Sequence, residues 1–249
     1  MEGESKKKAT FNDYGFMDLI FSWSIEDILD EEFYKNKVEK IGLSFQSISQ
    51  YLGSYKYPIL EETRASLSSS MEIIYQAPYG RVTGLKLAKP FKNKSDNEMD
   101  KPLKNKLYNL KIDRWENRFV LRGEPYKTLP GDVLVLADCN PESANDLQRF
   151  SRMWCFLSIV KTEDDNDGEN INSVCFKVTA SKDLDLEELR YKSLYIVFLT
   201  NVGSNRKIWT ALHMTSGNPK LFKQILCNSD DLCWCCVMCP FHVRLESEV

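Results

Sequence analysis

A change in hydrophobic pattern near residue 80 most constrains the fold of this chain. Before it, apolar residues recur at three- and four-residue spacing, which is typical of amphipathic helices. After it come six short runs rich in Val, Ile, Leu and aromatic residues: Arg81–Ala88, Leu107–Ile112, Asp132–Asp138, Met153–Lys161, Asn172–Ala180 and Leu194–Asn201. Turn residues separate most of these runs, which predicts the strands of a small antiparallel barrel. The run Phe119–Leu121 could add a seventh strand.

The first predicted helix begins with a capping-box-like sequence at Ser24. The serine oxygen can accept backbone N–H groups, and the acidic Asp27 lies close to the positive end of the helix dipole. An apolar stripe at helical spacing then follows through Ile25, Ile28, Leu29, Phe33, Tyr34 and Val38. The spacing predicts one continuous helix over this stripe.

Two more helices are predicted before the barrel. Ser44 is the expected cap of a short helix that ends near Gly53. Pro58 suits the first turn of a third helix, because its missing N–H would have no partner there. The apolar pattern carries this helix to about Tyr75.

The predicted fold is therefore α+β, with N-terminal helices, an antiparallel barrel of about six strands and C-terminal helices that pack back as a stalk. The returning helices are expected at Ser204–Met214 and Asn218–Leu226. The polar segment Glu163–Asn170 is interpreted as a hairpin loop. The chain then divides into a helical region at 1–79, a barrel at 80–202 with a mobile loop at 89–106, returning helices at 203–228 and a Cys-rich tail at 229–249.

The overall charge of −3 conceals an uneven distribution. Residues 1–78 carry 8 Lys/Arg against 13 Asp/Glu, and residues 131–249 carry 12 against 17, so each part has a net charge of −5. Residues 79–130 carry 13 against 6, a net charge of +7. A basic segment inside an acidic chain can attract phosphate groups. A solvated lysine-rich loop explains the same composition.

Aromatic residues are interleaved with the cations of this basic segment, namely Tyr108, Trp115, Phe119 and Tyr126. Such mixtures are typical of proteins that hold single-stranded nucleic acid, because bases stack on rings while phosphates contact cations. We therefore expect RNA or single-stranded DNA to be bound through Lys104, Lys106, Lys111, Arg114, Trp115, Arg118 and Arg122. A barrel core that alternates with a charged outer face explains most of these aromatic residues equally well.

Motifs for ATP-dependent or hydrolytic chemistry are absent from the sequence. There is no G-x-x-x-x-G-K-S/T and no G-x-G-x-x-G, so no backbone cradle for phosphates is predicted. The two histidines are His213 and His242, and no nucleophile elbow lies near His213. We expect a protein without catalytic residues and without cofactors.

The cysteines raise one metal-binding alternative. All eight follow residue 138, and five of them lie with His242 within residues 227–242. The C-x-x-C spacing of Cys236 and Cys239 suits zinc, but the segment is terminal and has no flanking hairpin pattern, so we expect no bound metal. No apolar run predicts a membrane span or a secretory signal. We expect reduced thiols and a nuclear or cytoplasmic location.

Several segments resemble the N-terminal region of plant senataxin-like helicases of superfamily 1. The closest likeness is in FSWSIEDILDEEFYKNKVEKI (Phe21–Ile41), SYKYPILEETRASLSS (Ser54–Ser69) and EIIYQAPYG (Glu72–Gly80). A looser likeness continues through YKTLPGDVLVLAD (Tyr126–Asp138), LYIVFLTNVGSNRKIWTALH (Leu194–His213) and NPKLFKQILC (Asn218–Cys227), so the resemblance covers about residues 15 to 227.

The resemblance implies a helical stalk that carries a small barrel, with the chain returning along the stalk. In that family the ATPase residues follow this region, so no catalytic residue is carried over. The sequence departs from the family at Gly42, where proline is expected, and in its last residues, VMCPFHVRLESEV. We expect a natural truncation. Two roles stay open: an accessory module that binds RNA or single-stranded DNA weakly, or a truncated helicase relative that acts through a protein partner.

Overall fold

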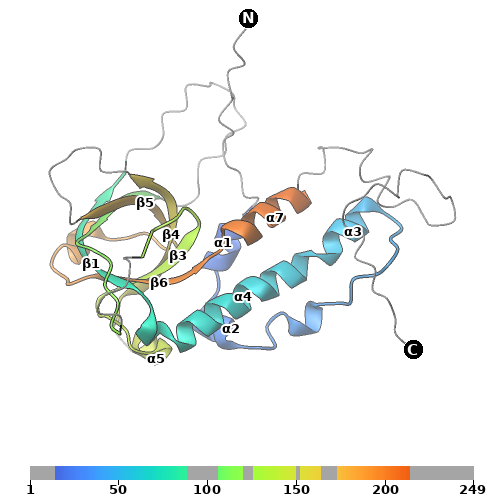
Figure 1. Cartoon of the computed structure of the whole chain (residues 1–249), viewed down its shortest axis with the longest axis horizontal. Coiled ribbons are helices and arrows are strands. Elements are labelled where there is room, and N and C mark those ends of the chain that lie inside the picture. Colours follow the sequence, from blue (N-terminus) through green and yellow to red (C-terminus); the bar gives the residue numbers. More distant parts are fainter. Residues whose placement is uncertain (1–14, 89–105, 120–125, 150–151, 164–172, 214–249) are drawn as a thin grey trace, which may run out of the picture.

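Helices and a closed β-barrel lie side by side in the computed structural model, and the fold is α+β (Figure 1). The structure describes residues 15–88, 106–119, 126–149, 152–163 and 173–213. Within these ranges the helices are α1 (Phe16–Phe21), α2 (Ile25–Leu29), η1 (Lys35–Lys37), α3 (Ile48–Ser54), α4 (Lys56–Glu72), η2 (Ile74–Gln76), α5 (Ala144–Gln148), α6 (Leu186–Leu189) and α7 (Gly203–His213). The strands are β1 (Tyr79–Leu87), β2 (Leu107–Ile112), β3 (Asp132–Ala137), β4 (Trp154–Glu163), β5 (Val174–Ala180) and β6 (Tyr195–Asn201).

The predicted six-stranded antiparallel barrel is confirmed. Its strand order is β1-β2-β5-β4-β3-β6, and β1 and β6 pair to close it. The antiparallel pair β4–β5 flanks the predicted hairpin loop, whose residues from 164 onward lie outside the described ranges. The expected loop at 89–106 also lies outside them, apart from Lys106. Phe119 belongs to no strand, and the rest of the expected seventh strand is outside the described residues.

A tight turn before β3 helps to close the barrel. Gly131 has a φ of 92°, which glycine adopts without strain, and a Cβ there would lie 3.0 Å from the Cα of Gly203. The next residue, Asp132, is fully buried. Its carboxylate accepts hydrogen bonds from the Tyr126 hydroxyl at 2.8 Å, from a backbone N–H and from the Asn201 amide at 2.6 Å. These contacts join the start of β3 to the end of β6.

The predicted capping box is confirmed, but the helix that it begins is much shorter than expected. The Ser24 hydroxyl accepts from the Asp27 N–H, and the Asp27 carboxylate accepts from the Ser24 N–H. Helix α2 then ends at Leu29, because the Asp30 carboxylate accepts the backbone N–H of Glu32 and so favours a turn. The prediction that one helix continues to Val38 is therefore wrong, and the Val38 side chain is 39% exposed.

The next two helices differ from the prediction at their ends. Ser47, and not Ser44, caps α3, and its hydroxyl accepts the Gln50 N–H at 3.1 Å. Pro58 lies in the first turn of α4, as predicted. That helix has 17 residues and is followed by the short η2. None of the helices in the described ranges is long and apolar enough to cross a membrane.

Helices from before and after the barrel pack together, as expected. The Phe16 ring of α1, a helix that the sequence analysis missed, lies 5.6 Å from the Trp209 ring of α7. The Asn205 amide of α7 donates to the Thr63 hydroxyl of α4 at 2.9 Å. Helix α7 confirms the first returning helix, whereas Asn218–Leu226 lies outside the described residues.

Two hydrophobic cores meet at the barrel wall. One fills the barrel and includes Leu110, Leu134 and Phe176. The other lies between the helices and the outer face of β3, β4 and β6, where the barrel contributes Val133, Val135, Ala137, Phe156, Val197 and Leu199. All six residues of β3 are consequently buried. The helices therefore cover one half of the barrel, whereas β1, β2 and β5 contribute no buried residue to the helical core.

Candidate nucleic-acid interface

Four polar residues form a row across the uncovered half of the barrel. Lys86 of β1 pairs with Asn109 of β2, Asn109 pairs with Lys177 of β5, and Lys177 pairs with Lys161 of β4. Paired residues of neighbouring strands point to the same side of a sheet and lie about 4.8 Å apart, so the row spans about 14 Å. Lys86, Asn109 and Lys161 are exposed, and Lys177 is partly buried.

A fourth lysine lies beside this row. Lys111 follows Asn109 by two residues on β2 and therefore points to the same side. It lines a shallow hollow of 270 Å³ together with Lys86 and Asn109. The hollow lies where β1 carries a bulge between Val82 and Gly84. We call Lys86, Lys111, Lys161 and Lys177 the basic face.

The charges of the basic face repel one another. Lys161 and Lys177 are paired next to a register shift between β4 and β5, and like charges at paired positions destabilise a sheet unless something compensates for them. Lys177 takes part in a further interaction within the protein. Within the described residues, Lys86, Lys111 and Lys161 have no ion-pair partner. The exposed Asp113 continues β2 beyond Lys111 at the edge of the face. This surface suits a ligand that brings several negative charges.

Only part of the set predicted from the sequence belongs to this surface. Lys111 does. Lys106 is exposed but forms an ion pair with Asp183 at 2.7 Å, and this hydrogen bond and the nearby negative charge raise the pKa of Lys106. Lys104 and Arg122 lie outside the described residues.

The two predicted arginines have different environments. The Arg114 side chain is 75% exposed, and its Nε lies 3.7 Å from a Glu116 carboxylate oxygen. The Arg118 side chain is only 16% exposed and donates to the carbonyls of Asn140 and Pro141. It also lies over the Tyr79 ring at 5.5 Å. The Arg118 guanidinium therefore holds two segments together, and its contact with nucleic acid stays a prediction.

Trp115 does not lie at this surface. Its side chain is 7% exposed and belongs to the core inside the barrel. The indole N–H donates to the Thr128 hydroxyl at 2.7 Å, and the ring packs edge to face against Tyr126 at 5.3 Å. A ring enclosed in this way cannot stack on a base. Tyr108 is buried as well, so among the four aromatic residues that the sequence analysis named, Tyr108, Trp115, Phe119 and Tyr126, only Phe119 is largely exposed.

The sequence analysis missed Lys86, Lys161 and Lys177. Two of these lysines lie in the acidic C-terminal part of the chain, so a count of net charge along the sequence separated them from Lys111. The alternation of buried and outward residues along each strand could have indicated which lysines face outward. In β2, for example, the outward Asn109 and Lys111 alternate with the buried Leu110. Strand pairing then brings lysines from distant segments together.

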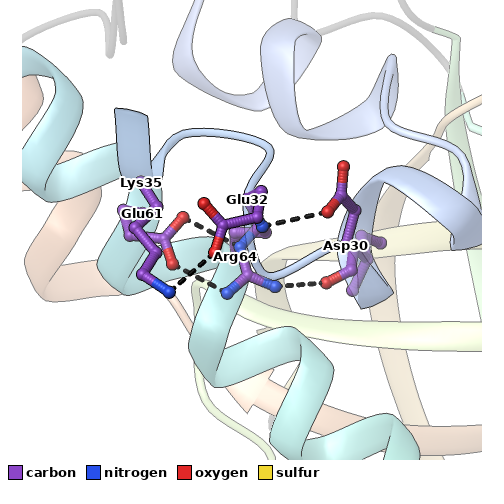
Figure 2. A network of polar contacts seen from close by, with 6 residues as sticks. Asp30, Glu32, Lys35, Glu61 and Arg64 are labelled. Carbon is purple, nitrogen blue, oxygen red and sulfur yellow. Dashed lines mark hydrogen bonds and ion pairs between the residues drawn. The ribbon is translucent and has the colours of Figure 1, made fainter. Parts of the chain in front are cut away.

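A second concave surface, beside α4, has a different character. Figure 2 shows the contacts between Arg64 and Glu61, two of the residues that line it. It measures 320 Å³ and is lined mainly by polar residues, among them Glu31, Glu61 and Glu72. The buried Arg64 forms two hydrogen bonds to Glu61 and donates to the Ile28 carbonyl at 2.6 Å. Arg64 thus ties the end of α2 to α4. Three glutamates against Lys35 and Arg64 leave this hollow without the excess of positive charge that attracts phosphate.

The comparisons with known proteins assign a family but no activity. No curated protein matches the chain. A family model described as a domain of unknown function (DUF6469) matches residues 12–232, which include both the helices and the barrel. The chain therefore belongs to the DUF6469 family.

Proposed function

We propose that this chain is a non-catalytic accessory module that binds RNA or single-stranded DNA weakly through the basic face. The observation that carries the proposal is the row of Lys86, Lys177 and Lys161, to which Lys111 adds a fourth charge. Lysines on the outside of a barrel can contact successive phosphates and release their counterions.

The context that we propose is a helicase-like protein. The resemblance to senataxin-like helicases implies a stalk and a barrel ahead of an ATPase core, and the order of helices, barrel and helix agrees with that arrangement. The sequence contains no P-loop, so nucleotide hydrolysis is not part of the proposed role. The module would add contacts to a nucleic acid in the nucleus or cytoplasm.

The test is the binding of a labelled single-stranded oligonucleotide, measured by fluorescence anisotropy across a range of salt concentrations. The triple variant Lys86→Glu, Lys111→Glu, Lys161→Glu should lose detectable binding. The matched control reverses three exposed lysines of the helical part: Lys40→Glu, Lys56→Glu, Lys207→Glu. It changes the net charge equally but should leave the affinity almost unchanged.

The salt dependence makes the test more specific. Each phosphate contact with a single strand contributes roughly 0.7 to the slope of log affinity against log salt concentration. The single variants Lys86→Gln, Lys111→Gln and Lys161→Gln should each lower the slope by about that amount. Equal binding by the two triple variants would contradict the proposal, as would an absence of wild-type binding at low salt. A protein partner would then be the better account.

A further inference from the structure

An exposed pair of aromatic rings lies at the opposite end of β1 from Lys86. Tyr75 of η2 is 39% exposed, and Phe119, which follows β2, is 67% exposed. Their ring centroids are 6.0 Å apart, and the ring planes are nearly perpendicular at 88°. In such an edge-to-face pair, each ring touches the other only along an edge or on one face. Most of the Phe119 side chain therefore stays exposed beside Tyr75.

The pair is held by contacts on both sides. Beside Tyr75, the backbone of Tyr79 exchanges hydrogen bonds with the backbone of Glu116 at 2.9 and 2.7 Å. Next to Phe119, Arg118 is fixed to the carbonyls of the 140–141 segment. The two exposed rings are thus carried by anchored backbone. An anchored ring reduces the entropy that is lost when a ligand binds.

Two exposed arginines lie between this pair and the basic face. Arg81 points outward from β1, and Arg114 follows β2. The two segments are adjacent, because the Arg81 carbonyl accepts the N–H of Asp113, the residue before Arg114. From Arg81 to Lys86 the strand rises about 17 Å. Arg81 and Arg114 therefore lie along the β1–β2 ladder between the basic face and the rings, in a stretch that also holds the exposed Asp113 and Glu116.

We propose that Tyr75 and Phe119 form a stacking site for an unpaired nucleobase of the same strand whose phosphates contact the basic face. The inference rests on the proposed function and adds a second kind of contact to it. Every base has a π-face, so stacking tolerates any sequence but requires the base to be free of a duplex. The arginines next to the rings favour a base that is attached to a phosphate chain over a neutral apolar ligand.

The experiment uses the full chain with three fluorescein-labelled probes: a single strand, the same strand in a duplex, and a strand of equal length with abasic positions. Phe119→Ala and Tyr75→Ala should each weaken binding to the single strand by about tenfold, in line with measured losses of base stacking. Binding to the abasic strand should be weaker than to the intact strand and should not respond to either substitution. The wild type should prefer the single strand to the duplex.

Two further variants separate stacking from a structural effect. Phe119→Trp keeps a stacking surface and should restore the affinity. Ile208→Ala removes an exposed apolar side chain from α7 and should change nothing. A single strand that carries the fluorescent base 2-aminopurine should be quenched by the wild type and by Phe119→Trp, and much less by Phe119→Ala.

The outcomes distinguish this inference from the proposed function. Binding that depends on Lys86, Lys111 and Lys161 but is unaffected by Phe119→Ala overturns the stacking site alone. Equal affinity for the intact and abasic strands does the same. An absence of wild-type binding to every probe at low salt overturns both proposals.

Discussion

The two halves of the barrel wall differ in what lies outside them. In β3, all six residues are buried, because Leu134 and Leu136 fill the barrel while Val133 and Val135 pack against the helices. In β2, only alternate residues are buried, and the outward positions hold polar residues such as Lys111. The first half is a structural seam between two cores. In the part of the chain that the structure describes, the second half contributes no buried residue to the helical core.

This difference teaches how the sequence pattern of a strand reports its surroundings. A strand that is covered on both faces consists of continuous apolar residues, as in DVLVLA (Asp132–Ala137). A strand with one solvated face alternates, as in LYNLKI (Leu107–Ile112). Substitutions in the two halves should therefore have different consequences, with large losses of stability in the first and changes in binding in the second.

The largest effect is expected where the helices cover the barrel. Trp209→Ala in α7 should lower the free energy of unfolding by about 3–5 kcal/mol, because it leaves a cavity in the shared core. Urea unfolding followed by circular dichroism measures the change. Ile208→Ala on the exposed side of the same helix should cost less than about 0.5 kcal/mol. If the two substitutions lower the free energy of unfolding by similar amounts, α7 does not bury Trp209 against the barrel.

A smaller loss is expected at the start of β3. Asp132→Ala should lower the free energy of unfolding by about 3 kcal/mol, since three donors that bind its carboxylate would lose their partner. The control is Asp113→Ala on the exposed end of the other half, which should fall within about 0.5 kcal/mol of wild type. Urea unfolding of the wild type, Asp132→Ala and Asp113→Ala under the same conditions measures the difference. A stable Asp132→Ala protein would show that the turn is held by backbone contacts alone.

The hydroxyl of Tyr126 predicts a dependence on alkaline pH. Burial, and then the hydrogen bond to Asp132, raise the pKa of Tyr126 above its ordinary value of 10.0. The phenol therefore stays protonated in the folded protein while it ionises in the unfolded chain, so its contribution to stability is present below about pH 10 and lost as the pH rises further. Tyr126→Phe should cost about 1 kcal/mol at pH 7. Between pH 9 and 11, its unfolding free energy should fall less than that of wild type.

The smallest effect should have the opposite sign. Lys161→Thr removes one of two lysines at paired positions of β4 and β5, and should raise the free energy of unfolding by about 0.2–1 kcal/mol. Lys86→Thr is the matched control, because Lys86 lies opposite Asn109 and not another cation. Both variants should bind the single-stranded oligonucleotide less well. If Lys161→Thr lowers stability, the two lysines are already compensated within the chain, and the electrostatic case for a bound polyanion is lost.

Much of the fold was predictable because it follows from local pattern. The switch to short β-rich runs predicted the barrel, and the capping sequence at Ser24 placed the start of α2. Helix lengths were less predictable. The apolar stripe of α2 continues past Asp30, but a side-chain hydrogen bond to the Glu32 N–H favours a turn over another helical residue. Helix α1 is only six residues long and depends on its contact with α7, which no local pattern reveals.

The candidate site was predictable only in part. The set of residues expected to bind nucleic acid included Lys111, which belongs to the basic face, and the +7 segment contains β1 and β2. The same set also included Trp115, which is buried inside the barrel, and Arg118, which holds two segments together. Composition cannot distinguish a ring that packs inside the barrel, such as Trp115, from one that lies outside it, such as Phe119. The two residues are only four positions apart in the sequence.

The sequence by itself determined the order of helices, barrel and helix and the absence of a P-loop, since hydrophobic periodicity and motif spacing are local properties. Only the tertiary structure decided which charges share a surface. Lys161 and Lys177 belong to an acidic part of the chain, and the pairing of β2, β5 and β4 places them beside Lys86 and Lys111. Tertiary packing also enclosed Trp115 and left Phe119 exposed four residues later. The physical reason is that strand register and burial depend on contacts between residues far apart in the sequence.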